Sequence, residues 1–129
     1  MAAAKKTLEI LSQTDALKTI NDVGAKIQVI LKEKFNAYDI PCTFSGPESM
    51  FGIHFSDFVP SNYRDWKETK AEMYTTFAKH LIDLGIMVEP DSREPWFICE
   101  AHQAIDFSAL AEKIELALQR TLSVDASVE

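Results

Sequence analysis

One short run of strictly alternating residues constrains the fold of this chain most. In the run Met50–Phe55, the side chains of Phe51, Ile53 and Phe55 fall on one side of an extended strand, and that side is strongly apolar. A second strand-like run, 42–44, precedes it, and a Gly-Pro turn signal lies between the two. We therefore expect an antiparallel strand pair with one face that must be covered by other elements.

Amphipathic runs before and after this pair predict the helices that cover it. Residues 2–11 are rich in good helix formers, and apolar residues recur at helical spacing from about 15 to 37, with Gly24 a weak point inside that run. A further helix is expected over residues 63–84. Its buried stripe is expected to include Trp66, Met73 and Phe77.

The C-terminal half continues with short strands and a last helix. Gly85 fits a helix C-terminus, 86–88 and 96–99 resemble strands, and a polar loop with two prolines joins them. Asp106 is expected to cap the last helix, and Ile105 and Leu110 are placed to form a hydrophobic staple.

The resulting element order is α-α-β-β-α-β-β-α, which predicts an α+β fold with helices on one face of a small, largely antiparallel sheet. The chain has 129 residues, which suits a single domain. We expect a helical lead-in over 1–38, a core over 42–122 and a frayed tail over 123–129.

Charge and composition exclude several classes of function. The net charge is −7 and no cluster of Lys and Arg is present, so nucleic-acid binding is not expected. No apolar run approaches the ~20 residues that span a bilayer, and the N-terminus has no signal peptide, so we expect no membrane partner and a cytoplasmic protein. Cys42 and Cys99 are interpreted as buried free thiols.

Three segments, in this order and spacing, resemble one family. They are Ser49–Phe55 with Asn62-Tyr63 after it, His80–Pro90, and Glu94–His102, which leads into the Asp-capped final helix. Together they are similar to the C-terminal (small) domain of class III, pyridoxal-phosphate-dependent aminotransferases, and most to the glutamate-1-semialdehyde 2,1-aminomutase group. The resemblance covers nearly the whole chain.

The resemblance implies the small domain of a fold-type-I enzyme that helps to close the substrate site. In the full-length family, pyridoxal phosphate is held on a lysine of a large domain that precedes this region. None of the lysines here lies in that context, so no cofactor is expected on this chain alone, and the chain alone is not expected to be catalytic. A gene fragment, a split subunit and a stand-alone domain all stay open. So do the substrate and the choice between aminomutase and transaminase.

The same considerations give the expected partners. The chain is expected either to dock on a separate large-domain chain or to form a homo-oligomer, with a symmetric dimer through the first two helices favoured. An interaction module that acts without catalysis is the alternative function, and an unrelated small enzyme that uses Glu94 and His102 is a third.

The resemblance implies two substrate-site residues. Glu94 matches the family glutamate near the active-site entrance, and Arg93 is a candidate to hold a substrate carboxylate, although pairing with Asp91 or Glu94 at the surface is the ordinary alternative for it. Arg93 and Trp96 both depart from the residues usual for the family. Phe97 is expected in the core.

Metal binding and serine catalysis are not expected. Cys99 and His102 supply at most two ligands, whereas a structural zinc site needs four. His102 is instead expected to make a structural hydrogen bond where the last strand meets the helix. Ser49 precedes an apolar strand and has no glycine elbow around it.

Overall fold

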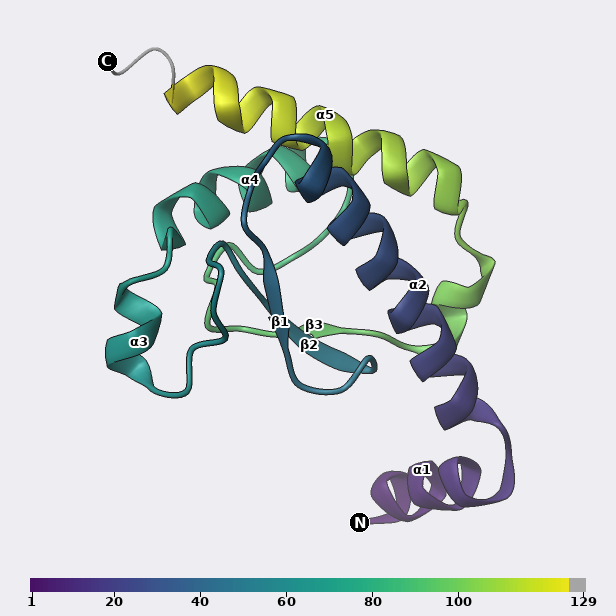
Figure 1. Cartoon of the computed structure of the whole chain (residues 1–129). Helices are drawn as coiled ribbons and strands as arrows, with labels where there is room; N and C mark the ends of the chain where they lie inside the picture. Colours follow the sequence, from purple (N-terminus) through teal and green to yellow (C-terminus); the bar gives the residue numbers. More distant parts are fainter. Residues whose placement is uncertain (126–129) are drawn as a thin grey trace.

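A computed structural model describes residues 1–125 and has the expected α+β architecture (Figure 1). Three short antiparallel strands form one sheet in the order β1-β2-β3. The elements in chain order are α1 (Ala2–Gln13), α2 (Ala16–Ala37), β1 (Thr43–Ser45), β2 (Met50–His54), α3 (Tyr63–Lys67), α4 (Ala71–Asp83), β3 (Trp96–Phe97), the 3-10 helix η1 (Glu100–Ala104) and α5 (Phe107–Asp125).

The hydrophobic core lies between one face of the sheet and the helices α2, α4 and α5. Phe51 and Ile53 of β2 point to the same side of the strand, and both belong to the cluster that contains residues from all three helices. Phe35 of α2 meets Phe77 of α4 edge to face, with 5.4 Å between ring centroids. Helices therefore cover one face of the sheet, as the alternating pattern requires.

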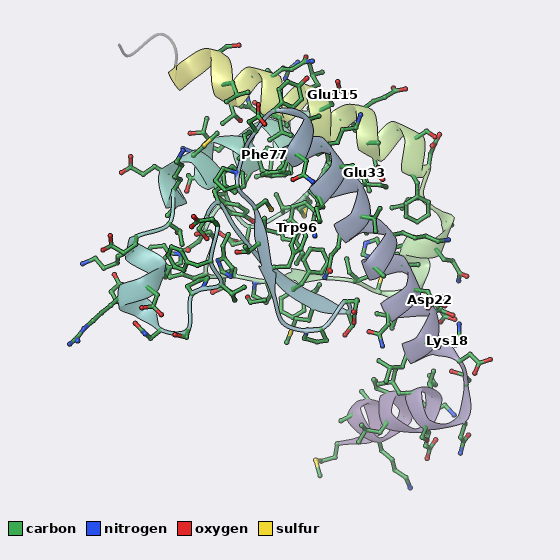
Figure 2. All side chains as sticks on the ribbon, in the orientation of Figure 1. Lys18, Asp22, Glu33, Phe77, Trp96 and Glu115 are labelled. Atoms are coloured by element: carbon green, nitrogen blue, oxygen red, sulfur yellow. The ribbon has the colours of Figure 1, made fainter. Side chains whose placement is uncertain are left out.

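Polar side chains also join the C-terminal end of α2 to the middle of α5. Lys34 of α2 donates to Glu115 of α5 at 2.5 Å, and Tyr38 donates to the same carboxylate at 3.3 Å. Figure 2 shows Glu115 at the edge of the core, with Phe77 in the interior below it. The hydrogen bond to Glu115 raises the pKa of Lys34, and the same bond lowers the pKa of Glu115.

Two helix ends follow the local sequence signals. Gly85 adopts a φ of +83° after α4, and the N–H groups of Gly85 and Ile86 donate to the carbonyls of Ile82 and Leu81, which completes a Schellman motif. The Asp106 carboxylate accepts from the N–H groups of Ser108 and Ala109 at 2.9 and 3.1 Å. Both expected caps are confirmed.

Gly24 has a steric purpose in α2. A Cβ atom at this position would lie 1.9 Å from the carbonyl oxygen of Glu48, in the β1–β2 connection. Only a residue without a side chain lets α2 approach the hairpin this closely. The feature that weakens the helix in the sequence therefore permits its packing.

The expected helix over 63–84 is two helices. The Asn62 side chain caps α3 by accepting from the N–H groups of Arg64 and Asp65, at 2.8 and 3.2 Å. Residues 68–70 then leave the helix, and the N–H of Lys70 donates to the carbonyl of Phe55 at 3.1 Å. This bond ties the break to the end of β2, a tertiary contact that local propensity does not encode.

The expected strands near the C-terminal end are shorter than predicted. Residues 86–88 have no strand pairing, although Ile86 and Val88 are half-buried while Met87 is 96% exposed. The alternation of a strand is therefore present without a partner. The last strand contains only Trp96 and Phe97 of the four residues expected.

Three burial predictions are wrong. Phe97 is 67% exposed, because Trp96 faces the core and successive strand residues point to opposite sides. Trp66 is half-buried on α3 outside the core cluster, and Tyr74 of α4 is the large buried aromatic of this region. Cys99 is exposed, whereas Cys42 is half-buried and burial raises the pKa of its thiol to about 12.

The two ends of the chain differ in how they pack. Figure 1 shows α1 projecting away from the body of the molecule, and no residue of this helix is buried. At the other end, α5 runs to Asp125, so residues 123–125 are helical, and the expected fraying of the tail stays a prediction. The rest of the expected tail, 126–129, lies outside the described residues.

Candidate functional site

An open groove of about 1080 Å³ lies beside the last strand. Its walls are the unpaired segment 85–89, the segment 94–98 that contains β3, and the first turns of α5. Apolar side chains such as Ile86 and Leu110 line much of it, and carboxylates of Glu89, Asp91, Glu94 and Asp106 also contribute. This groove is the candidate functional site.

Glu94, the leading site residue from the sequence, lines this groove. Its side chain is exposed to solvent. Its backbone is fixed, because the Glu94 N–H donates to the Asp91 carbonyl at 3.0 Å and closes a turn. The result is an accessible carboxylate on an ordered loop, which suits acceptance of hydrogen bonds from a cationic group.

Arg93 does not line the groove. Its Nε lies 2.9 and 3.0 Å from the two carboxylate oxygens of Asp91, and Nη2 also donates to Asp91. These hydrogen bonds lower the pKa of Asp91 to about 2 and raise that of Arg93. The guanidinium therefore makes the surface ion pair that the sequence left as the alternative to substrate binding.

Behind the groove, Trp96 is held by a buried polar chain. Its Nε1 donates to the Tyr74 hydroxyl at 3.0 Å, and that hydroxyl donates to the Glu89 carbonyl at 3.1 Å. Burial is the main cause of a raised pKa at Tyr74. Trp96 is buried and is one of the residues that line the groove, so it forms part of the inner wall.

Tyr74 was missed as a site-forming residue in the sequence. Its spacing to Phe77, Ala78 and Leu81 places all four on one face of α4, and all four are buried. The interpretation followed Met73 and Trp66 instead, because it took 63–84 as one continuous helix. A helix that starts at Ala71 has its buried stripe shifted to Tyr74.

The histidines make structural contacts. The Nδ1 of His102 accepts from the Cys99 N–H at 2.9 Å, which confirms its expected place at the junction between strand and helix. His54 of β2 lies 2.9 Å through Nε2 from the Ser45 hydroxyl. Within residues 1–125, no group of His, Cys, Asp and Glu is arranged to hold a metal ion, and no helix is long and apolar enough to cross a membrane.

Comparisons with known proteins agree with the resemblance seen in the sequence. No protein-family model matches the chain. Glutamate-1-semialdehyde 2,1-aminomutase of Thermus thermophilus is 29% identical over 119 residues, which are 92% of this chain and 28% of that enzyme. The enzyme of the same name from Polynucleobacter necessarius is 31% identical over 117 residues, 91% of this chain and 26% of that enzyme.

A solved structure agrees in fold. The pyridoxal-phosphate internal aldimine form of the FumI protein from Sphingopyxis sp. MTA144 superimposes with a TM-score of 0.78 and 25% identity. The match covers 98% of this chain and 28% of that one. The chain thus spans about a quarter of the length of the curated relatives that it matches.

The groove does not fit pyridoxal phosphate by itself. Its lining includes Glu89, Glu94 and Asp106, besides Asp91, whose charge is balanced by Arg93, against Lys113 and His102. A phosphate group would therefore meet an excess of negative charge there. The cofactor is therefore assigned no place on the residues described here. In sequence and in fold, the chain is similar to the C-terminal domain of class III, pyridoxal-phosphate-dependent aminotransferases of the glutamate-1-semialdehyde 2,1-aminomutase group.

Proposed function

We propose that this chain is the small, substrate-facing domain of a pyridoxal-phosphate-dependent aminotransferase or aminomutase. The cofactor and its lysine would belong to a large domain outside these 129 residues, either on the same polypeptide or on a separate chain. Support comes from relatives that match over about a quarter of their length and from the fold of the FumI protein. The expected compartment is the cytoplasm.

The observation that carries this proposal is the position of Glu94. Its exposed carboxylate lines an open, largely apolar groove, on a turn whose backbone is hydrogen-bonded. When a large domain covers this groove, Glu94 would lose solvent and accept hydrogen bonds from the ammonium group of a substrate or from a basic side chain. Its part in the reaction is then to orient the substrate.

Arg93 has a smaller place in this proposal. To hold a substrate carboxylate, its guanidinium would first have to leave Asp91, with which it already makes the paired hydrogen bonds that such a ligand would offer. We therefore assign the substrate contact to Glu94 and keep Arg93 as a second candidate only.

A chimeric enzyme tests the proposal. The chain replaces the matching C-terminal part of the Thermus thermophilus aminomutase, and amino-group transfer is assayed with Glu94→Gln and with the control Glu100→Gln. Glu100 is also an exposed carboxylate, on η1 and outside the groove lining. Loss of a hydrogen bond to a charged group predicts a fall in kcat/KM of about tenfold or more for Glu94→Gln and less than about twofold for Glu100→Gln. Equal effects of the two substitutions would contradict the role of Glu94.

A separate measurement checks where the cofactor belongs. The isolated chain is mixed with pyridoxal phosphate, reduced with borohydride and digested. A stoichiometric absorbance near ~420 nm that becomes fixed to one lysine, as Schiff-base chemistry requires, would place the cofactor on this chain instead. We expect only scattered, substoichiometric labelling of surface lysines.

The second candidate function is an interaction module, and the packing of α1 favours it. Leu8 of this helix is 67% exposed and Ile10 is 43% exposed, and Leu17 of α2 next to them is 49% exposed. A helix with no buried residue gains little from this fold, so its apolar side chains are available to a second copy or to a large-domain chain.

Sedimentation velocity at increasing concentration tests self-association of the isolated chain. We expect a dimer, and we expect Leu8→Glu to shift the equilibrium toward the monomer. The control Val59→Glu, at a 51% exposed residue outside α1, α2 and the groove lining, should leave it unchanged. A monomer at all concentrations would exclude the homodimer and leave a separate partner chain.

A further inference from the structure

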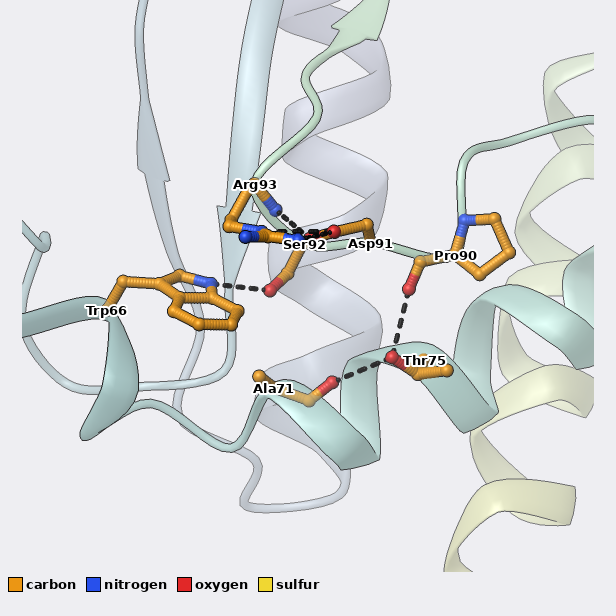
Figure 3. A network of polar contacts seen from close by, with 7 residues as sticks. All are labelled: Trp66, Ala71, Thr75, Pro90, Asp91, Ser92 and Arg93. Carbon is orange, nitrogen blue, oxygen red and sulfur yellow. Dashed lines mark hydrogen bonds and ion pairs between the residues drawn. The ribbon is translucent and has the colours of Figure 1, made fainter. Parts of the chain in front are cut away.

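The loop that carries Glu94 is attached to α3 and α4 at three of its residues, two of which are drawn in Figure 3. The Glu89 carbonyl accepts from Tyr74 at 3.1 Å, and the Pro90 carbonyl accepts from Thr75 at 3.0 Å. At Ser92, the side chain accepts from Nε1 of Trp66 at 2.8 Å. Each contact comes from a side chain on the helices, so the loop depends on tertiary contacts for its shape.

Of the three helix residues that contact the loop, Trp66 contacts the loop residues that are nearest to Glu94 in the sequence. Besides its bond to Ser92, its ring lies 5.1 Å from the guanidinium of Arg93, and Tyr63 stacks on it with 5.4 Å between centroids. Figure 3 shows the indole of Trp66 beside Ser92 and Arg93, and Asp91 on the far side of that arginine. Ser92 is only 3% exposed, so its hydroxyl is shielded where it accepts the indole N–H.

The position of the Asp91–Glu94 turn depends on where Trp66 holds Ser92 and Arg93. The Asp91 carboxylate accepts from the backbone and side chain of Arg93, and the Asp91 carbonyl accepts the Glu94 N–H. A shift of Trp66 would therefore move Ser92 and Arg93 and release the turn that places the Glu94 carboxylate at the groove. Nothing in the α3 sequence by itself indicates this coupling.

We propose that Trp66 is a positioning residue for Glu94, acting through its hydrogen bond to Ser92 and its contact with Arg93. The effect of Trp66 on substrate binding rests on the proposed function, because it matters for the reaction only if Glu94 contacts the substrate. The effect of Trp66 on the position of the loop does not depend on that function. Trp66 fixes the Asp91–Glu94 turn, and this keeps the cationic side chain of Arg93 outside the groove.

Amide hydrogen exchange on the labelled 129-residue chain tests whether Trp66 holds the loop in position. Trp66→Phe keeps a ring under Arg93 but removes the indole donor, and Ser92→Ala removes the acceptor from the other side. Each is expected to speed exchange of the Arg93 and Glu94 amides about tenfold, the effect of losing one intramolecular hydrogen bond. Exchange at Leu118, a buried residue of α5, should change less than about twofold.

Three further variants make this test specific. In the double variant Trp66→Phe/Ser92→Ala, the Glu94 amide should exchange no faster than in the faster single variant. The reason is that the two substitutions remove the same hydrogen bond. Ser92→Thr keeps the hydroxyl and should retain slow exchange. Lys67→Gln, on α3 but facing the ring of Tyr63, is the matched control and should have no effect.

The indole resonances give a direct signature, since the chain has two tryptophans. Ser92→Ala should shift the N–H signal of Trp66 and leave that of Trp96, whose partner is Tyr74, in place. Unchanged exchange at Arg93 and Glu94 in both Trp66→Phe and Ser92→Ala would overturn the proposal. If one variant fails to fold, the other tests the same bond.

Kinetics of the chimera separate this proposal from the function on which it rests. Trp66→Phe is expected to raise KM about fivefold with kcat unchanged, and to add nothing to Glu94→Gln. If Trp66→Phe speeds amide exchange while Glu94→Gln leaves kcat/KM unchanged, the positioning role of Trp66 is supported and the substrate role of Glu94 is contradicted. If Glu94→Gln is impaired while Trp66→Phe neither loosens the turn nor raises KM, positioning fails and the proposed function stands.

Discussion

The two faces of the small sheet differ sharply although they are built from neighbouring residues. On the face covered by helices, Phe51 and Ile53 are 0% and 1% exposed, and Trp96 is 8% exposed. On the other face, Met50 and Phe97 pair across β2 and β3 and are 43% and 67% exposed, whereas His54, farther along β2 on the same face, is 7% exposed. Only the Met50 end of that face is therefore uncovered. The covered face supplies stability, and the uncovered edge and the groove beside it are where a partner or substrate is expected to bind.

The largest predicted effect tests this difference at adjacent residues. Trp96→Ala removes a buried ring that packs near Phe51 and leaves the Tyr74 hydroxyl without its indole donor. We expect it to lower the free energy of unfolding by about 3–5 kcal/mol. Phe97→Ala, at the exposed position, should lower it by less than about 1 kcal/mol. Urea denaturation of both variants measures the contrast.

This expectation reverses the one drawn from the sequence, which placed Phe97 in the core. If Phe97→Ala proves as damaging as Trp96→Ala, the strand has the opposite orientation or its outer face is covered by a second copy. Repeating the denaturation at several protein concentrations separates these outcomes, because stabilisation by association depends on concentration.

How much the sequence could predict depended on how local each signal was. Caps at Gly85 and Asp106, the β1–β2 pair and the long helix α2 rest on neighbouring residues, and all are present. The run 96–99 is apolar at every position, so it has no alternation to show which side faces the core. The missing partner of 86–88 and the break in 63–84 depend on contacts distant in sequence.

The candidate site shows the same division. Glu94 lines the groove, and its role at a substrate site, which the family resemblance implied, stays a prediction. The support of its loop by Trp66 and Tyr74 could not be seen in the sequence. Both aromatic residues have ordinary helical contexts. Their hydrogen bonds to Ser92 and Trp96 join positions 26 and 22 residues apart. Only the fold brings these pairs together.

The second prediction concerns the approach of α2 to the hairpin. Gly24→Ala gains helix propensity but places a Cβ atom against the Glu48 carbonyl, so the helix or the hairpin must move. We expect a net loss of about 1–3 kcal/mol, the cost of overpacking. Ala25→Gly is the control for propensity alone and should cost about 1 kcal/mol or less. A more stable Gly24→Ala variant in thermal or urea denaturation would refute the close contact.

The third prediction uses pH and concerns His54, which is buried although it lies on the same face of β2 as the exposed Met50. Burial lowers the pKa of His54 below its usual 6.5. Below pH 6.5 the unfolded chain therefore binds a proton that the folded chain resists, and stability falls as the pH decreases toward the folded pKa. For one proton the slope is at most about 1.4 kcal/mol per pH unit.

The variant His54→Gln should flatten this dependence between pH 5 and 6.5, a window above the usual pKa range of the carboxylates. His80→Gln, on α4, serves as the control and should retain the slope. Urea midpoints recorded at half-unit pH steps suffice. An equally steep decline without His54 would assign the acid sensitivity to other groups.

The smallest predicted effect is at Glu94, and its smallness is the informative result. The side chain is exposed, and the bond that closes its turn comes from the backbone N–H, which substitution does not remove. Glu94→Ala should therefore change the stability of the isolated chain by less than about 1 kcal/mol. Removing its charge relieves repulsion with the other carboxylates of the groove but also removes its attraction to Arg93, so the two effects oppose each other. Chemical denaturation at low and high salt measures the net change, because both effects are screened by salt. A residue that costs the fold nothing, yet impairs the chimera when substituted, has its purpose outside this domain. Destabilisation as large as that of Trp96→Ala would instead make Glu94 a structural residue and remove the basis of the proposed site.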